Sequence, residues 1–256
     1  MSRVLAELAA ALRPELIAWA VVSLRVLPVT VLCPVLGGQL VPSPVRLAVA
    51  GAIGLALRPL AGAVPVGSFD LLARCGHEAG VGLLIGLGAA LPFDAARMGG
   101  RLIDLVRGTS AEAALPVAGH REAATGDLLH QLLVSLAVAG GALPVLVHAL
   151  ARSYVLAPPG VVLGVSSALE LARLLGVTLA TGLAVAAPVV ALSWATDATV
   201  GLVVRAAPGL PATELATPVR ILGGGTVLWL SLGLVADRLL RGVLAPGEWL
   251  SEVLGR

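Results

Sequence analysis

Residues 171–204 read LARLLGVTLATGLAVAAPVVALSWATDATVGLVV, and this stretch determines the fold class. About 20 consecutive apolar residues in a helix are enough to cross the hydrocarbon core of a bilayer. Because lipid offers the backbone no hydrogen-bond partners, an apolar stretch that crosses it has to be helical. This one is too long for a single straight crossing and contains Pro188, which predicts a kink or a break into two helices.

The same composition recurs along the chain. Of its 256 residues, 58% are hydrophobic and only 12% charged, and the mean hydropathy is +0.99. Since soluble domains usually carry about 25% charged residues, we predict an all-α membrane protein that forms one membrane-embedded domain over residues 1–256. Residues 1–13 are expected to lie amphipathically at the interface and to be retained, unlike a signal peptide. The six segments long enough to span are residues 14–36, 44–66, 79–96, 128–151, 171–204 and 219–241.

Charged residues interrupt these segments at Arg25, Arg58 and Asp197. An Arg or Asp at the centre of a lone spanning helix costs about 2.5–3.5 kcal/mol on insertion. Such residues normally face protein, water or one another, so we expect other protein to shield these helices. For Arg58, the alternative is snorkelling, in which the aliphatic part of the side chain lies in the apolar region and the guanidinium reaches the membrane interface. Arg25 and Asp197 have two alternatives, pairing with each other or with residues of partner subunits.

The arginines do not reveal the membrane orientation. If all six segments span and the N-terminus is cytoplasmic, nine Arg flank the inner side and seven flank the outer side. Polytopic proteins usually show a clearer cytoplasmic excess. Either the topology is inverted, or the helices are not all conventional spans.

Glycine patterns predict close helix contacts. Gly82 and Gly86 are four residues apart, the spacing that lets two membrane helices approach closely. The run Gly223-Gly224-Gly225 favours a close approach or a bend, because neither glycine region has the strand or the GKS/GKT sequence of a phosphate loop.

The longest polar interruption runs from Arg97 to Asp127. Its first part can continue the third helix, and residues 108–125 have the Gly, Ala, Thr, Ser, Pro and charged composition of a loop. Loops of this length often form lids or binding elements. The alternative is a solvated tether.

No motif for catalysis, metal or cofactor binding is present in the sequence. His77-Glu78 lacks the second His of a zinc-protease helix, and His120, His130 and His148 lack metal-ligand spacing. The two cysteines form no CxxC pair. A net charge of +2 gives no basic patch for nucleic acid. We predict neither an enzyme nor a nucleic-acid-binding protein, with no cofactor.

Four local patterns occur in a fixed order along the chain. The first is Arg25-x-x-Pro28, Pro34, Gly37 and Val41-Pro42-x-x-Val45-Arg46. The second is Glu78-x-Gly80-x-Gly82-x-x-x-Gly86, Pro92-Phe93-Asp94-Ala95 and Gly99-Gly100-x-x-Ile103-Asp104-x-x-x-Gly108. The third is Pro188, Asp197, Gly201 and Arg205-x-x-Pro208, and the fourth is Thr217-Pro218-Val219-Arg220 with Gly223. Over about residues 15–240, their order resembles the FliR/YscT/SctT family of membrane proteins in type III secretion and flagellar export.

The resemblance implies a multi-pass subunit of the bacterial inner membrane, in contact with lipids, that helps form and plug a channel for exported unfolded proteins. The implied partners are FliP/SctR-like and FliQ/SctS-like subunits and an FlhB/SctU-like switch protein. The resemblance implies that about six long apolar helices, some of them bent or broken into hairpins, pack with partner subunits into an export-gate cone. The loop 108–125 resembles the family's plug, with Gly108, Thr109, Ser110, Leu115, Pro116, His120, Arg121 and Thr125 as its gating residues. The implied subunit-contact or structural residues are Arg25, Pro28, Pro34, Pro42, Arg46, Glu78, Gly82, Gly86, Phe93, Gly100, Asp104, Pro188, Asp197, Arg205, Pro208, Pro218 and Arg220.

The segment 205–220 departs from the family pattern. Gly209, Pro211 and Thr213 replace the usual Gln, Asn and aromatic residue, and Arg220 replaces a Lys. These departures favour an injectisome, with a flagellar system possible. An autonomous secondary transporter is the alternative function, since broken helices and midplane charges suit it, although no internal duplication is visible. A membrane-embedded enzyme would need a cluster of polar side chains, which the sequence lacks.

Overall fold

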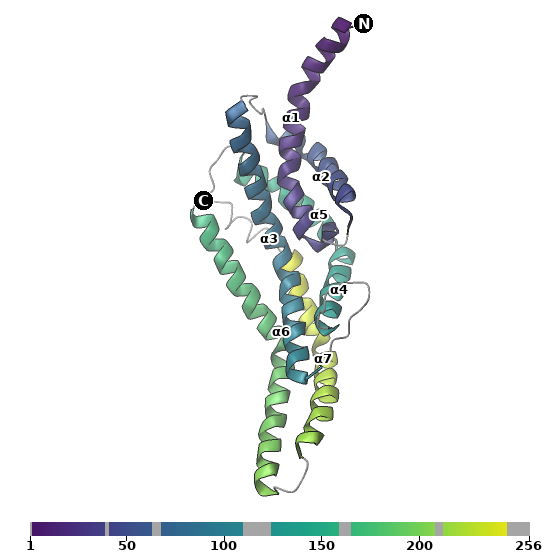
Figure 1. Cartoon of the computed structure of the whole chain (residues 1–256), viewed down its shortest axis with the longest axis vertical. Coiled ribbons are helices and arrows are strands. Elements are labelled where there is room, and N and C mark those ends of the chain that lie inside the picture. The colour runs from purple at the N-terminus through teal and green to yellow at the C-terminus, as the bar shows by residue number, and fades with distance from the viewer. Residues whose placement is uncertain are drawn as a thin grey trace. The chain divides into compact units, whose positions relative to one another are not determined.

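The computed structural model describes residues 2–38, 41–62, 68–109, 124–158, 165–207 and 212–244. Every regular element in these ranges is a helix, which confirms the predicted all-α class. In chain order (Figure 1) the elements are α1 (Ser2–Leu32), η1 (Pro34–Leu36), α2 (Ser43–Leu57), η3 (Arg58–Ala61), α3 (Ser68–Arg107), α4 (Ala124–Ala139), α5 (Ala142–Leu156), α6 (Val165–Ala206) and α7 (Ala212–Leu244).

The described helices give five to six candidate membrane spans, where the sequence predicted six. Among the described residues, five helices are long and apolar enough to cross a membrane, and α4 with α5 makes a sixth, bent candidate. The bend falls at Gly140 and Gly141, where Gly141 has a φ of 81° that favours glycine. The predicted segment 128–151 is thus divided between α4 and α5, because this glycine pair ends α4 and turns the chain before Ala142.

Two helices are longer than predicted. α3 has 40 residues and α6 has 42, so each is about 60 Å long, roughly twice the thickness of the hydrocarbon core. α6 continues through Pro188, so the predicted break into two helices is wrong. Proline removes only one backbone donor, and the turns around it are held by buried neighbours, Val185, Ala186 and Val189.

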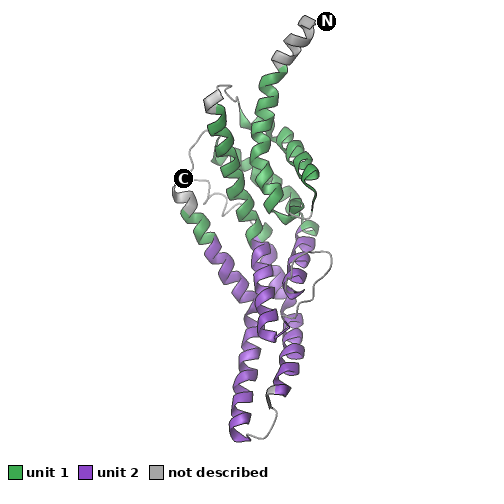
Figure 2. Ribbon diagram, viewed as in Figure 1, with its two compact units in different colours: residues 1–91, 138–174, 243–256 green, residues 92–137, 175–242 purple. Residues whose placement is uncertain are grey.

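The chain divides into two compact units (Figure 2). Unit 1 comprises residues 1–91, 138–174 and 243–256, and unit 2 comprises residues 92–137 and 175–242. The single domain over residues 1–256 stays a prediction.

Unit 1 has its core between α1, α3 and α5. α1 packs along α2, and α5 contacts the short helices η1 and η3. The helical spacing of Val22, Val26 and Val29 places these side chains on one face of α1. They are at most 1% exposed, as are Ile85 of α3 and Leu150 of α5 in the same cluster.

Glycines bring α3 against the backbone of α1 in unit 1. A Cβ atom at Gly82 would lie 2.1 Å from the Arg25 carbonyl oxygen, and one at Gly86 would lie 3.1 Å from the Pro28 carbonyl oxygen. Any side chain at Gly82 would therefore push the helices apart. The predicted close contact of this glycine pair is confirmed.

Glycines also allow close contacts between helices in unit 2. A Cβ atom at Gly100 of α3 would lie 2.4 Å from the Cα atom of Gly126 in α4. A Cβ atom at Gly99 would lie 2.8 Å from the Gly182 carbonyl oxygen of α6. These contacts fix α3 closely against both neighbouring helices.

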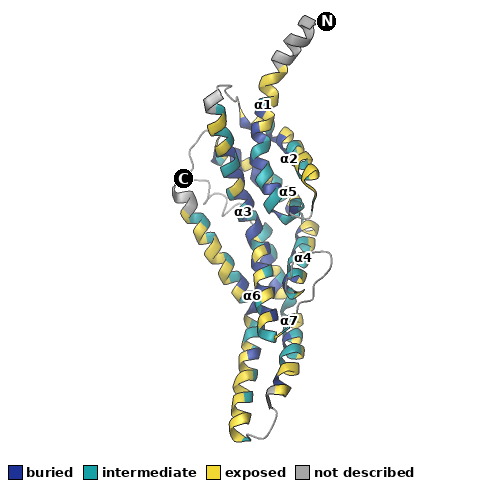
Figure 3. Cartoon of the chain, viewed as in Figure 1, coloured by how far each residue is buried: buried dark blue, intermediate teal, exposed yellow. Residues whose placement is uncertain are grey.

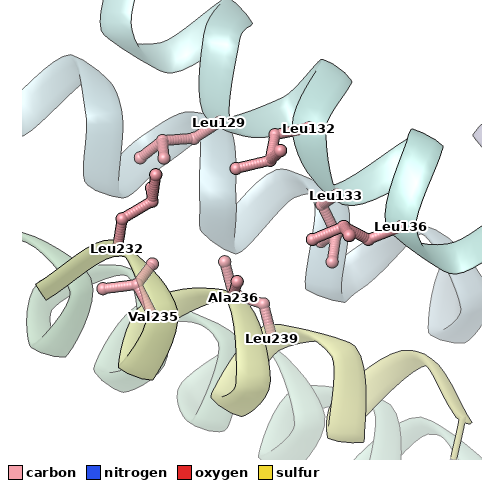
Figure 4. Close-up of a pocket in the computed structure, with 8 residues that line it drawn as sticks. All are labelled: Leu129, Leu132, Leu133, Leu136, Leu232, Val235, Ala236 and Leu239. Atoms are coloured by element: carbon pink, nitrogen blue, oxygen red, sulfur yellow. The ribbon is translucent and has the colours of Figure 1, made fainter. Parts of the chain in front are cut away.

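Leucines join α4 to α7 in unit 2. Figure 4 shows the side chains of the two helices facing each other across a cavity of about 10 Å³, room for about one water molecule. This cavity is an apolar packing seam and has no group that would orient a ligand. Its lining residues are Leu129, Leu132, Leu133, Leu136, Leu232, Val235, Ala236 and Leu239.

Burial is uneven among the helices, and Figure 3 shows long exposed stretches on α6 and α7. In the most apolar stretch of each helix, 56% of the residues are buried in α3, 22% in α6 and 11% in α7. Trp194 and Trp229 are 71% and 73% exposed. These apolar faces have to be covered by lipid or by other protein.

Candidate functional site

The most deeply buried charges lie in unit 1, on α1 and α3. Arg25 is 0% and Glu78 is 1% exposed. Arg25 Nε donates to Glu78 Oε2 at 2.6 Å, and Arg25 Nη2 donates to Glu78 Oε1 at 3.0 Å. This two-pronged geometry is the strongest form of an Arg–carboxylate pair. Because Gly82 lies one turn after Glu78 on the same helix face, it lets α1 approach closely enough for the pair to form.

α5 completes the surroundings of the guanidinium. Arg25 Nη1 donates to Ser153 Oγ at 3.1 Å, and Nη2 also donates to the Ala157 carbonyl oxygen at 2.9 Å. The Tyr154 ring lies 4.0 Å from Arg25 Cζ, a cation–π contact. Sequence reasoning missed Ser153 and Tyr154, which lie inside α5 but just beyond the end of the predicted apolar segment 128–151.

The partners of the other membrane charges are also in the chain. Asp197 of α6 pairs with Arg220 of α7 within unit 2. Arg25 pairs with Glu78, so the alternative that Arg25 and Asp197 bind each other is wrong. Arg58 lies 3.1 Å from Glu15 and donates to the Gly62 carbonyl oxygen at 3.0 Å. The predicted sites thus contain two helix-to-helix ion pairs, one buried and one half-exposed.

Asp104 of α3 binds both ends of the predicted loop in unit 2. Its Oδ2 accepts the Thr125 backbone N–H at 2.8 Å, and its Oδ1 accepts the Thr125 hydroxyl. The Thr109 hydroxyl donates to the same Oδ1 at 3.2 Å. Asp104 is 3% exposed. Three of the predicted site residues therefore meet at one carboxylate.

Arg107 fills the notch left by the glycine run of α7. Its Nη2 donates to the Ile221 carbonyl oxygen at 2.8 Å. A Cβ atom at Gly224 would lie 2.9 Å from Arg107 Cγ, and one at Gly225 would lie 3.3 Å from Arg107 Nη2. The glycine run thus allows a close approach at Gly224 and Gly225, but an arginine side chain of α3 makes it, where the sequence predicted a backbone approach or a bend.

The remaining predicted residues are spread over the helices or lie outside the described residues. Phe93 is buried, and its ring contacts the His130 ring edge-on, with 6.0 Å between the ring centroids. Arg46 Nε donates to the Val41 carbonyl oxygen at 2.9 Å, and Arg205 is exposed at the end of α6. Within helices are Pro28, Pro34, Pro188 and Pro218, and Pro42 directly precedes α2. Ser110, Leu115, Pro116, His120, Arg121 and Pro208 lie outside the described residues.

Metal-ligating side chains do not cluster in the part of the chain that the structure describes. No group of three or more His, Cys, Asp or Glu there is arranged to hold a metal ion. Cys33 is buried and Cys75 is partly buried, both as free thiols.

These long apolar helices, joined by a buried ion pair and by glycine contacts, define a multi-pass α-helical membrane protein. Residues 16–244 match the family described as bacterial export proteins, family 1. The chain belongs to this family, and the resemblance to the FliR/YscT/SctT family is confirmed.

Individual relatives cover the chain to different extents. The flagellar biosynthetic protein FliR of Caulobacter vibrioides is 28% identical over 223 residues, 85% of this chain and 89% of its own length. The Yop proteins translocation protein T of Yersinia pestis is 38% identical over 93 residues, 36% of each chain. The protein of the same name from Yersinia pseudotuberculosis matches to the same extent.

Proposed function

We propose that this chain is a subunit of a type III protein export gate in the bacterial inner membrane. The observation that carries the proposal is the family match over residues 16–244, which includes all the candidate spans except the first few residues of the first. The relatives are named for flagellar biosynthesis and for Yop translocation. The cargo is unfolded protein passing through the channel, and no catalytic step is assigned to the chain.

Partner subunits cover the exposed faces of α6 and α7 in this proposal. Asp197 and Arg220 are 50% and 31% exposed, although both belong to apolar membrane helices. A half-exposed ion pair is costly against hydrocarbon and cheaper against protein or water. FliP/SctR-like and FliQ/SctS-like subunits are the proposed neighbours, and an FlhB/SctU-like protein is the proposed switch.

The loop over residues 108–125 is the proposed plug of the channel. Support comes from its base, where Thr109 and Thr125 share the Asp104 carboxylate. A segment with both ends fixed at one point is suited to blocking a passage, because its ends cannot drift apart with the exported chain. Apolar and small side chains of the assembled ring would complete the constriction.

Ion conductance of the assembled gate tests this function. Residues 110–123 are replaced by a short Gly/Ser linker that keeps Thr109 and Thr125, and the chain is co-expressed with its partner subunits. We expect the purified complex to conduct ions in a planar bilayer where the unaltered complex does not. A matched control replaces residues 159–164, between α5 and α6, with the same linker. Equal conductance of the loop variant, the control and the unaltered complex would contradict the plug.

A further inference from the structure

The C-terminus of α3 ends in a Schellman motif built around Asp104. The Thr109 N–H donates to the Asp104 carbonyl oxygen at 3.0 Å, and the Gly108 N–H donates to the Leu105 carbonyl oxygen at 3.2 Å. Gly108 has a φ of 71°, the left-handed conformation that this motif requires. In many such motifs an apolar contact joins the two ends. Here the Thr109 hydroxyl donates to the Asp104 carboxylate instead.

The same carboxylate caps the next helix. Thr125 is the second residue of α4, so its N–H is one of the amides without a partner inside the helix. Asp104 Oδ2 accepts that N–H at 2.8 Å. A negative charge at a helix N-terminus is also favoured by the helix dipole. α4 therefore receives from α3 a cap that is usually supplied by the residue preceding a helix.

Close helix packing makes this contact possible. Gly100 lies one turn before Asp104 on α3, where a Cβ atom would reach 2.5 Å from the Gly126 backbone nitrogen. Gly100 and Gly126 form the backbone contact between α3 and α4. The hydrogen bonds of Asp104 go instead to Thr109 and Thr125, the two described residues at the ends of the loop.

We propose that Asp104 is a positioning residue that fixes both ends of the 110–124 segment on one carboxylate. The bonds to Thr109 set where the chain leaves α3, and the bonds to Thr125 set where it enters α4. Thr109 and Thr125 are thus both held by a charge that belongs to this chain. The inference rests on the proposed function only in taking this segment to be the plug.

Hydrogen exchange in the assembled complex tests the anchor. The variants Asp104→Ala and Asp104→Asn are compared with the unaltered chain in peptides that contain the Thr125 amide. Net hydrogen bonds to charged groups correspond to about a 10- to 100-fold change in an opening equilibrium, so we expect exchange at Thr125 to accelerate by this factor. Exchange at Leu129 and Leu133, buried further along α4, is expected to stay unchanged.

Matched variants separate the anchor from general damage. Asp237→Asn removes a carboxylate that is 56% exposed and pairs along α7 with Arg241, and it should leave Thr125 exchange unaltered. If the Asp104 variants do not assemble, Thr125→Val removes one bond to the carboxylate, and Thr125→Ser retains it. Val should accelerate exchange and Ser should not.

The outcomes distinguish the anchor from the plug. Unchanged exchange at Thr125, or equal acceleration along all of α4, would overturn the anchoring role whatever the conductance. Faster exchange confined to the ends of the segment supports it. If ions still fail to pass through a complex with that local change and through the linker variant, the anchor stands and the plug function is wrong.

Discussion

Replacement of Glu78 by Gln is expected to destabilise the fold by about 3–5 kcal/mol, the cost of removing one partner of a buried ion pair. The guanidinium of Arg25 would then be buried with one neutral acceptor in place of two charged oxygens, beside Ser153 and the Ala157 carbonyl oxygen. Because each 1.4 kcal/mol is tenfold, the folded fraction relative to the unfolded one should fall by about a hundredfold to a few thousandfold. Arg25→Met should cost a similar amount, because it removes both guanidinium hydrogen bonds from the buried Glu78 carboxylate.

The double substitution Arg25→Met with Glu78→Leu should be less harmful than either single change. It removes both charges, and apolar replacements of buried pairs are often close to neutral. The stability midpoint is measured by titrating the purified complex with SDS in mixed micelles and following helical circular dichroism. Arg241→Met is the control, because its pair with Asp237 is exposed and contributes about 0–1 kcal/mol.

A double-mutant cycle then gives the coupling energy between Arg25 and Glu78. We expect a coupling of at least about 2 kcal/mol, since the pair is fully desolvated and doubly hydrogen-bonded. If Glu78→Gln shifts the midpoint no more than Arg241→Met does, or if the two single effects simply add, the pair does not hold α1 to α3 and the reasoning fails.

Three further substitutions test individual contacts. Gly82→Ala should lower the apparent melting temperature of the complex, because its Cβ atom would lie 2.1 Å from the Arg25 carbonyl oxygen. Gly76→Ala, in the same helix, places its Cβ atom in open space and should stabilise the fold by about 0.5–1 kcal/mol. Equal shifts in melting temperature for the two variants would contradict the close crossing of α1 and α3. Trp19→Phe removes the bond from Nε1 to the Gly51 carbonyl oxygen at 2.8 Å and should cost about 1 kcal/mol in the SDS titration, and no change would show that the bond contributes nothing. Arg107→Ala should accelerate hydrogen exchange around Gly224, and Arg107→Lys should accelerate it less, because lysine restores only part of the contact. Protection of this region equal to that in the unaltered chain would exclude the contact between Arg107 and the glycine run.

The helical class and the number of spans followed from hydropathy alone, because lipid permits few other structures. The boundaries did not. Residues 97–107 continue α3, as the sequence predicted, but α3 already begins at Ser68, well before the predicted segment 79–96. Pro188 predicted a kink or a break into two helices, and α6 continues through it without a break.

The site residues were predictable one by one, and their pairings were not. Arg25 and Glu78 stood out as charges in or beside apolar segments, but they are 53 residues apart and meet only when α1 packs on α3. Ser153 is 128 residues from Arg25 and gave no signal of its own. Asp104 and Thr125 lay in two different predicted roles, subunit contact and plug, and the structure joins them at one carboxylate.

Native mass spectrometry of the tagged chain, purified from its host membrane in mild detergent, measures whether it works as a subunit. We expect a heteromeric assembly in which this chain occurs together with several copies of two smaller helical membrane proteins, and loss of the chain when those partners are not co-expressed. A stable, monodisperse monomer that binds a small solute by itself would contradict the export-gate function and favour an autonomous transporter.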